Sequence, residues 1–515
     1  PLKRSQISSH ASRGGIMTKM GIAGLVALSI FMCMWEPYPI YTEEPGSLIG
    51  RYDSVVVKHS EVLTLRARWL YVKDSIIVRE GGTLLISDSQ CVVGDEIKVE
   101  EGGSLTIRES FIDMGCQLRF AGDVRLERVM WFQTHDKNPP SVLLEGCANL
   151  IIESSDLCGA SSVPAISGTC NSVSITDCQL SAGALVSFID LSAKRFSMSD
   201  NRLLVSQPGP ERTRDRNVEL VVVSVVAEEI AISGNSCVAY ALCKSVYSCM
   251  AVLSVKMDGN RFRVITSEED GVDSVIVCRA RKVDMLNNVI LGAGYRTFIR
   301  VDESHEVRVR ANQAIGGYKV WAMFSISSIV CVVSCNKVVS SDMCSNIMVL
   351  DASYLAVTGN IVKNCDVSSV YWVVSGIDIF EANSILDCRG ARLPRMIENP
   401  YVHKKPQGRR KDSHAWDLLI VQGQARGRHC SFDANAIERC KAVRMCLLMG
   451  EWSVGEVISS VAGWTVLNNT FDVLLEVESE WNSESASRVL DLLRNANRVA
   501  RLVGVSRVAK PEMWE

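Results

Sequence analysis

Positive charge is concentrated in one segment of this chain, residues 389–415. The segment holds eight basic and two acidic residues, a net charge of +6, whereas the whole chain of 515 residues has a net charge of −3. Clustered cations of this kind bind sulfated glycans, phosphates or nucleic acid. The candidate polyanion-binding residues are Arg389, Arg392, Arg395, Lys404, Lys405, Arg409, Arg410 and Lys411. The alternatives are a solvated loop and a protease-sensitive site at residues 408–411.

Acidic residues and metal ligands form no comparable cluster in the sequence. Asp177, Asp200 and Asp258 belong to different repeats, which is typical of solvated corners rather than of a paired general acid and base. Cys331 and Cys335 have no His nearby, so we expect no zinc site. We therefore expect no catalytic residue, no metal site and no cofactor. The triplet that starts at Asn468 is the one standard glycosylation acceptor.

A repeated Asn defines the elements that must position these residues. Ten segments with alternating apolar residues end on Asn, and from Asn288 the intervals are 24, 24, 24 and 23 residues. The ten are Asn201, Asn235, Asn260, Asn288, Asn312, Asn336, Asn360, Asn383, Asn435 and Asn469. Apolar residues at a spacing of two indicate a strand, and Asn tolerates the left-handed backbone conformation of a sharp turn. A fixed period of this size indicates stacked units.

A second apolar run precedes each Asn segment, as in ELVVVSVV (219–226) and VWAMFSI (320–326). One coil is therefore a strand, a short turn, a strand, the Asn corner and a looser return. This pattern predicts an all-β fold, a right-handed parallel β-helix of about 16 coils with an Asn ladder. The N-terminal coils carry Ser, Val or Cys where Asn later stands. An antiparallel β-sandwich or a propeller is the alternative, but a period of 24 is too short for a propeller blade.

Three of the nineteen cysteines are regularly placed. Cys365, Cys388 and Cys440 each follow a repeated Asn by five residues and should share one column. In a secreted chain, cysteines favour disulfides. The alternative is a stack of small buried hydrophobic side chains, and the spacing leaves both interpretations open.

The chain divides by composition into five parts. An N-terminal tail (1–20) precedes an apolar run (21–35), which is typical of a signal peptide or a signal anchor. The alternative for that run is a first helix that caps the coils. An entry segment (36–60), the β-helix (61–480, with loop insertions near 206–217 and 389–415) and a C-terminal coil or cap (481–515) follow. We expect a secreted or cell-surface protein, with membrane contact only through the N-terminal segment or through an anchor that this sequence lacks.

Over roughly residues 60–480 the pattern resembles the pectin-lyase-like right-handed β-helix proteins. That family includes pectate lyases, polygalacturonases and many non-enzymatic surface proteins. The NTD, DD, GHG and RIK motifs of polygalacturonases do not stand here as a set. The segment Arg392–Ile397 begins like the R-x-P-x-x-R stretch of pectate lyases, but Ile397 stands where the second Arg belongs. The resemblance therefore implies the fold more than the activity.

Short phrases such as LAVTGN (355–360), VVSG (373–376) and IAISGN (230–235) are similar to those of the dispersed gene family surface proteins of trypanosomes. That resemblance implies a surface or secreted protein without known catalysis. We expect a non-enzymatic β-helix protein that presents loops for adhesion or polyanion binding. Its partners would be surface or matrix glycans or another protein, and the near-neutral charge gives no reason to expect nucleic acid. The alternative is a carbohydrate-active enzyme, either a polysaccharide lyase or a glycoside hydrolase.

Overall fold

The computed structural model describes a series of short ranges that begins at Ile49. These are residues 49–113, 117–132, 141–158, 164–182, 187–205, 221–239, 245–265, 272–293, 295–318, 320–342, 344–375, 377–390, 417–422, 434–449, 464–467, 469–478, 498–499 and 502–503. The chain forms two units, Pro1–Glu44 and Pro45–Glu515, and every described residue belongs to the second. The expected tail and signal segment, residues 1–35, therefore lie outside the described residues.

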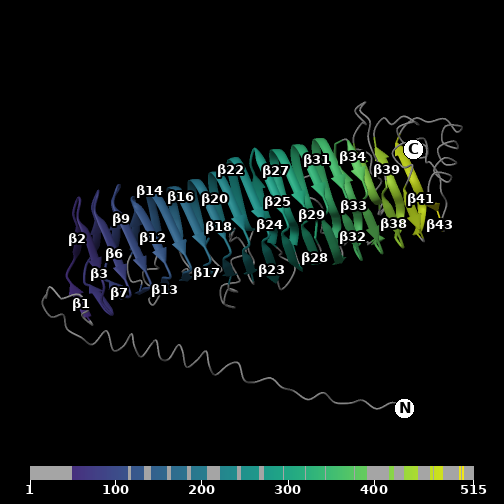
Figure 1. The fold of residues 1–515 in the computed structure, drawn as a ribbon. Coiled ribbons are helices and arrows are strands. Elements are labelled where there is room, and N and C mark those ends of the chain that lie inside the picture. Colours follow the sequence, from purple (N-terminus) through teal and green to yellow (C-terminus); the bar gives the residue numbers. More distant parts are fainter. Residues whose placement is uncertain are drawn as a thin grey trace, which may run out of the picture. The chain divides into compact units, whose positions relative to one another are not determined.

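The described residues contain strands and no helix, and the strands stack in parallel, coil upon coil (Figure 1). They form one sheet of 18 strands and one of 25 strands. Within the described ranges the first sheet receives one strand from each coil, which gives 18 coils where about 16 were expected. The structure confirms the all-β parallel β-helix, because the return segment of each coil serves as the crossover that a parallel pair requires.

The first sheet begins with β1 and ends with β42, and each strand pairs with the equivalent strand of the next coil. Its strands are β1 (Ile49–Tyr52), β4 (Trp69–Val72), β7 (Gln90–Val93), β10 (Phe111–Asp113), β13 (Met130–Phe132), β15 (Asp156–Cys158), β17 (Gln179–Ala182), β19 (Arg202–Val205), β21 (Ser236–Ala239), β23 (Arg261–Ile265), β26 (Val289–Ala293), β28 (Gln313–Tyr318), β30 (Lys337–Asp342), β32 (Ile361–Lys363), β35 (Ser384–Leu386), β38 (Ala436–Glu438), β40 (Thr465–Leu467) and β42 (Arg498–Val499).

The second sheet contains two strand segments per coil, which in the middle coils merge into one long bent strand. Its strands are β2 (Val55–Val57), β3 (Val62–Leu65), β5 (Ile76–Val78), β6 (Thr83–Ser87), β8 (Glu96–Val99), β9 (Ser104–Arg108), β11 (Gln117–Phe120), β12 (Asp123–Glu127), β14 (Val142–Glu153), β16 (Ile166–Thr176), β18 (Ile189–Ser199), β20 (Val221–Ser233), β22 (Ser245–Asp258), β24 (Val272–Arg279), β25 (Lys282–Leu286), β27 (Tyr295–Arg310), β29 (Ala322–Ser334), β31 (Cys344–Thr358), β33 (Asp366–Val373), β34 (Ile379–Glu381), β36 (Arg389–Gly390), β37 (Asp417–Gln422), β39 (Lys441–Met449), β41 (Asn469–Glu478) and β43 (Leu502–Val503).

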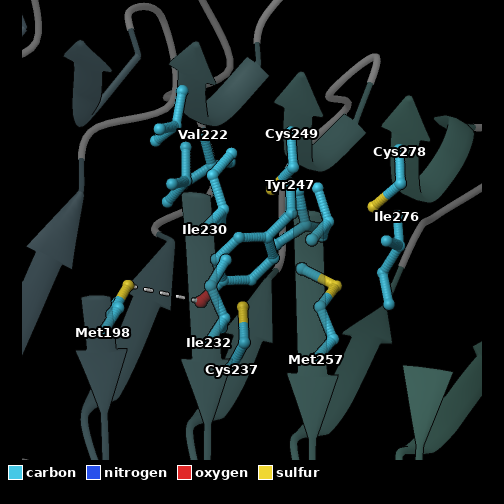
Figure 2. Close-up of a cluster of buried hydrophobic side chains, with 14 of the residues drawn as sticks. Met198, Val222, Ile230, Ile232, Cys237, Tyr247, Cys249, Met257, Ile276 and Cys278 are labelled. Carbon is cyan, nitrogen blue, oxygen red and sulfur yellow. Dashed lines mark hydrogen bonds between the residues drawn. The ribbon is translucent and has the colours of Figure 1, made fainter. Parts of the chain in front are cut away.

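The interior of the coils is one continuous apolar core. Successive residues of a strand point to opposite faces, so every second residue is buried; in β21, for example, Cys237 and Ala239 are buried. Figure 2 shows the core around Tyr247, whose hydroxyl donates to the Met198 sulfur at 3.8 Å. The Tyr247 ring also contacts Phe262 edge to face, with 5.5 Å between ring centroids. Burial of such side chains from every coil supplies the main stabilisation of the stack.

One expectation about the coil needs correction. The return after the Asn corner is a strand of the first sheet, such as β19, rather than a loose segment. Among the described residues the stack begins with β1, which lies within residues 36–60 and pairs with β4. At the other end, β42 and β43 continue the two sheets, so the described part of residues 481–515 belongs to a coil, one of the two forms that the sequence left open.

The turn at the Asn corner is also made by a different residue than expected. The left-handed conformation belongs to the residue before each Asn, as at Asp200 (φ 56°), Ala311 (φ 56°) and Cys335 (φ 56°), and none of the ladder Asn adopts it. Glycine serves the same position at Gly234 and Gly359. The Asn thus keeps a backbone that directs its side chain into the stack, and its neighbour makes the turn.

Candidate functional site

Nine of the ten expected Asn form one buried column. These are Asn201, Asn235, Asn260, Asn288, Asn312, Asn336, Asn360, Asn383 and Asn435, each at most 2% exposed. The Asn336 amide nitrogen donates to the Asn360 side-chain oxygen at 3.0 Å and to the Val309 carbonyl at 2.8 Å. The Asn336 oxygen accepts from the Asn312 amide at 3.0 Å and from the Asn312 backbone N–H at 2.9 Å. These hydrogen bonds satisfy the buried polar groups of each side chain, so the Asn residues of the column have a structural role.

The tenth expected member, Asn469, is not in this column. Strand β40 pairs with β38 so that Thr465 lies beside Ala436, which puts Trp464 in register with Asn435. Asn469 begins β41, where Thr470 pairs with Lys441, so Asn469 stands in register with Cys440. The column of Asn therefore ends at a buried Trp464, and Asn469 belongs to a second corner. The glycosylation candidate Asn468 lies outside the described residues.

Serines and a cysteine occupy the same column in the earlier coils, as the sequence suggested. The Ser110 hydroxyl accepts from the Ser89 N–H at 3.2 Å, and the Ser155 hydroxyl accepts from the Val129 N–H at 3.0 Å. The Cys178 N–H then donates to the Asn201 oxygen at 2.9 Å. A serine hydroxyl can thus replace the Asn oxygen as acceptor, whereas the side chains of Val129 and Cys178, at the same position, contain no oxygen.

A second column, made of thiols, follows the return strand. Cys365, Cys388 and Cys440 are buried and stand in register on three successive coils, since the residue after each pairs with its equivalent: Asp366 with Arg389, and Arg389 with Lys441. This confirms that the three cysteines share a column. None of the described cysteines is joined in a disulfide in this structure, and all except Cys158 and Cys335 are buried.

The Cys388 thiol is hydrogen-bonded with the thiols of both neighbours in the column. These hydrogen bonds with Cys365 and Cys440, together with burial, raise the pKa of the Cys388 thiol well above its ordinary value. The same hydrogen bonds lower the pKa of the Cys365 and Cys440 thiols. All three side chains are buried, as small apolar side chains of a core are.

The basic segment 389–415 is inserted at a defined place between two coils. Arg389 and Gly390 form β36 and pair with Asp366 and Val367, and the chain re-enters the sheet at Asp417, which pairs with Ser369. Between these paired positions the preceding coil has one residue, 368, whereas this coil has residues 391–416. The coil after shows the same spacing, because Arg389 pairs with Lys441 and Asp417 with Arg444.

Of the eight expected polyanion-binding residues, one belongs to the described part of the chain. Arg389 is exposed at the start of β36. The other seven lie outside the described residues: Arg392, Arg395, Lys404, Lys405, Arg409, Arg410 and Lys411. The smaller expected insertion at 206–217 also lies outside them. What the structure fixes is the pair of anchor points from which the basic insertion leaves and returns.

The three acids noted in the sequence do not all share one position of the coil. Asp177 and Asp200 occupy the left-handed corner position of successive coils, because the preceding Thr176 and Ser199 are paired. Asp258 lies at a different position, where it accepts from the Asn287 amide at 3.0 Å and faces the Lys256 ammonium at 3.8 Å. Within the described ranges, no three His, Cys, Asp or Glu side chains are grouped so that they could hold a metal ion. No described helix has the length and apolar character to span a membrane.

Comparison with protein-family models, with curated proteins and with solved structures yields no match to this chain. The structure shows a parallel β-solenoid, which is the part of the expected resemblance that concerns the fold. Membership of that family, or of the trypanosome surface proteins, stays a prediction from the sequence.

Proposed function

We propose that this chain is a secreted or cell-surface β-solenoid without catalytic activity, which presents the basic insertion 389–415 to a linear polyanion such as a sulfated glycan. The observation that carries the proposal is the anchoring of the insertion. Both of its ends lie on strands that are held by strands of the coil before and the coil after. A scaffold of this kind keeps a charged segment at a fixed place without taking part in the binding itself.

Electrostatics favour this segment over the rest of the chain. The insertion carries a net charge of +6 in a chain of net charge −3. In the first coils, by contrast, basic side chains are paired with acids of neighbouring coils, as in Arg119 with Glu145 at 2.6 Å and Arg125 with Glu153 at 2.7 Å. A polyanion would therefore be attracted to the insertion, with a strength that falls as salt shortens the Debye length, ~8 Å at physiological ionic strength.

The test is to replace residues 391–416 by one serine, which copies the spacing of the neighbouring coil. We expect the intact protein to be retained on heparin resin at low salt and eluted by added NaCl. The shortened protein should pass through, because seven of the eight clustered cations are gone. Its circular dichroism spectrum should stay that of the intact protein, since strands β36 and β37 keep their partners.

A matched control shortens the other expected insertion, residues 206–217, which carries three basic and two acidic residues. This variant should keep its heparin retention. Retention that survives loss of 391–416 would place the site elsewhere, and absence of retention by the intact protein would refute polyanion binding by this insertion.

A further inference from the structure

The thiol column lies directly at the base of the basic insertion. Cys388 is the residue before β36, from which the insertion starts, and Cys440 is the residue before β39 on the following coil. The Lys441 N–H donates to the Cys388 carbonyl at 2.9 Å, which fixes the two corners against each other. Equivalent residues of stacked strands lie ~4.8 Å apart. That spacing falls within the Cα separations of about 4.4–6.8 Å found in disulfides.

The sulfur atoms point to the same side of this corner. The Cys388 thiol donates to the Leu386 carbonyl at 3.3 Å and to the Val362 carbonyl of the coil before at 3.8 Å. The Cys440 thiol makes the equivalent pair of contacts, with Glu438 at 3.3 Å and with Ile385 at 3.5 Å. These contacts repeat the pattern of the ladder amides, so the column holds its sulfurs in line from coil to coil.

We propose that Cys388 and Cys440 form a disulfide when the protein meets an oxidising thiol–disulfide pool, and that this bond staples the two coils between which the basic insertion leaves the sheet. The oxidant is a low-molecular-weight disulfide. The two protein thiols give up two protons and two electrons and form one S–S bond, while the oxidant disulfide is reduced to two thiols. Because both residues are buried in the finished coil, the exchange takes place during folding.

Cys388 has two neighbours, and chain length favours Cys440 over Cys365. A bond to Cys440 closes a loop over 52 positions of the chain, whereas a bond to Cys365 closes one over 23. The longer loop removes more conformational freedom from the unfolded chain and so stabilises the folded chain more. A Cys388–Cys440 bond also spans both undescribed segments, 391–416 and 423–433. It would therefore keep the two parts of the chain joined after a cut in the basic insertion.

The test uses the whole chain, refolded with oxidised and reduced glutathione and cut briefly with trypsin under native conditions. Free thiols are then blocked with iodoacetamide in denaturant, and the products are compared by electrophoresis with and without reductant. We expect the fragments on either side of the basic insertion to remain linked without reductant and to separate with it. Cys388→Ser and Cys440→Ser should abolish the link. Cys365→Ser, in the same column, should leave it intact.

If a variant does not fold, mass mapping of the unreduced wild-type peptides identifies which cysteines are joined. A peptide pair joined through Cys388 and Cys440 is the expected result. A Cys365–Cys388 pair, complete alkylation of all three thiols, or a link that persists in Cys440→Ser would overturn the proposal. Heparin retention does not depend on this bond, so failure of the staple and failure of the proposed polyanion binding are distinguishable.

Discussion

Replacing Asn336 with Leu is expected to lower the free energy of unfolding by about 3–5 kcal/mol. The side chain lies in the middle of the column, and Leu removes the oxygen that accepts from both the Asn312 backbone N–H and the Asn312 amide. Each buried donor left without an acceptor costs about 1–3 kcal/mol. Leu also cannot donate to the Asn360 oxygen or the Val309 carbonyl. Urea unfolding followed by circular dichroism measures the change.

The control for this substitution is Lys337→Leu, on the next residue of the same coil. Lys337 is exposed at the start of β30, so its replacement should change the unfolding midpoint little. A midpoint for Asn336→Leu that equals that of the control would contradict a stabilising role of the column.

Gly168→Ala is expected to have a similarly large effect, again about 3–5 kcal/mol. Gly168 lies within β16 at a φ of +112°, a conformation that residues with a side chain rarely adopt. A Cβ there would lie 2.1 Å from the Leu144 carbonyl oxygen of the coil before, and this oxygen belongs to the backbone of a paired strand. Strain at such a φ costs about 1–3 kcal/mol, and the overlap with the paired strand adds about 1–3 kcal/mol or more.

A substitution at Gly146 distinguishes backbone strain from overlap with the paired strand. This glycine also has a positive φ, +76°, but a Cβ would meet nothing within 4 Å. Gly146→Ala should therefore show the backbone strain alone, about 1–2 kcal/mol. Thermal melts of the two variants, measured side by side, should differ clearly, and equal losses would show that crowding at Gly168 is unimportant.

The sequence predicts the fold because one residue type marks one corner. An amide that must both accept and donate along the stack leaves few substitutes, so Asn recurs at a nearly constant interval from Asn288 to Asn383. The return strand gives a weaker signal. A strand such as β35 has three residues and buries only Ile385, too few for an alternating pattern to be recognised.

The mistake at Asn469 has a physical origin. The interval from Asn435 to Asn469 is 34 residues, so the period no longer fixes the register, and an apolar phrase ending on Asn was assigned to the wrong corner. The sequence did contain a signal for the correct corner. Asn469 follows Trp464 by five residues, as Cys440 follows Asn435 by five, which puts Asn469 at the position of Cys440. The residue that makes the corner turn was also beyond prediction, since position rather than residue type gives Ala311 and Cys335 their left-handed backbone.

The ladder of amides has a consequence for how such a chain changes in length. Every Asn from Asn288 to Asn360 donates two hydrogen bonds to the Asn of the next coil and accepts the same two from the Asn of the coil before. Duplication or loss of a 24-residue unit between two of these Asn therefore joins surfaces that already match. A chain of this kind can therefore change in length by whole coils without exposing an unmatched amide inside the ladder.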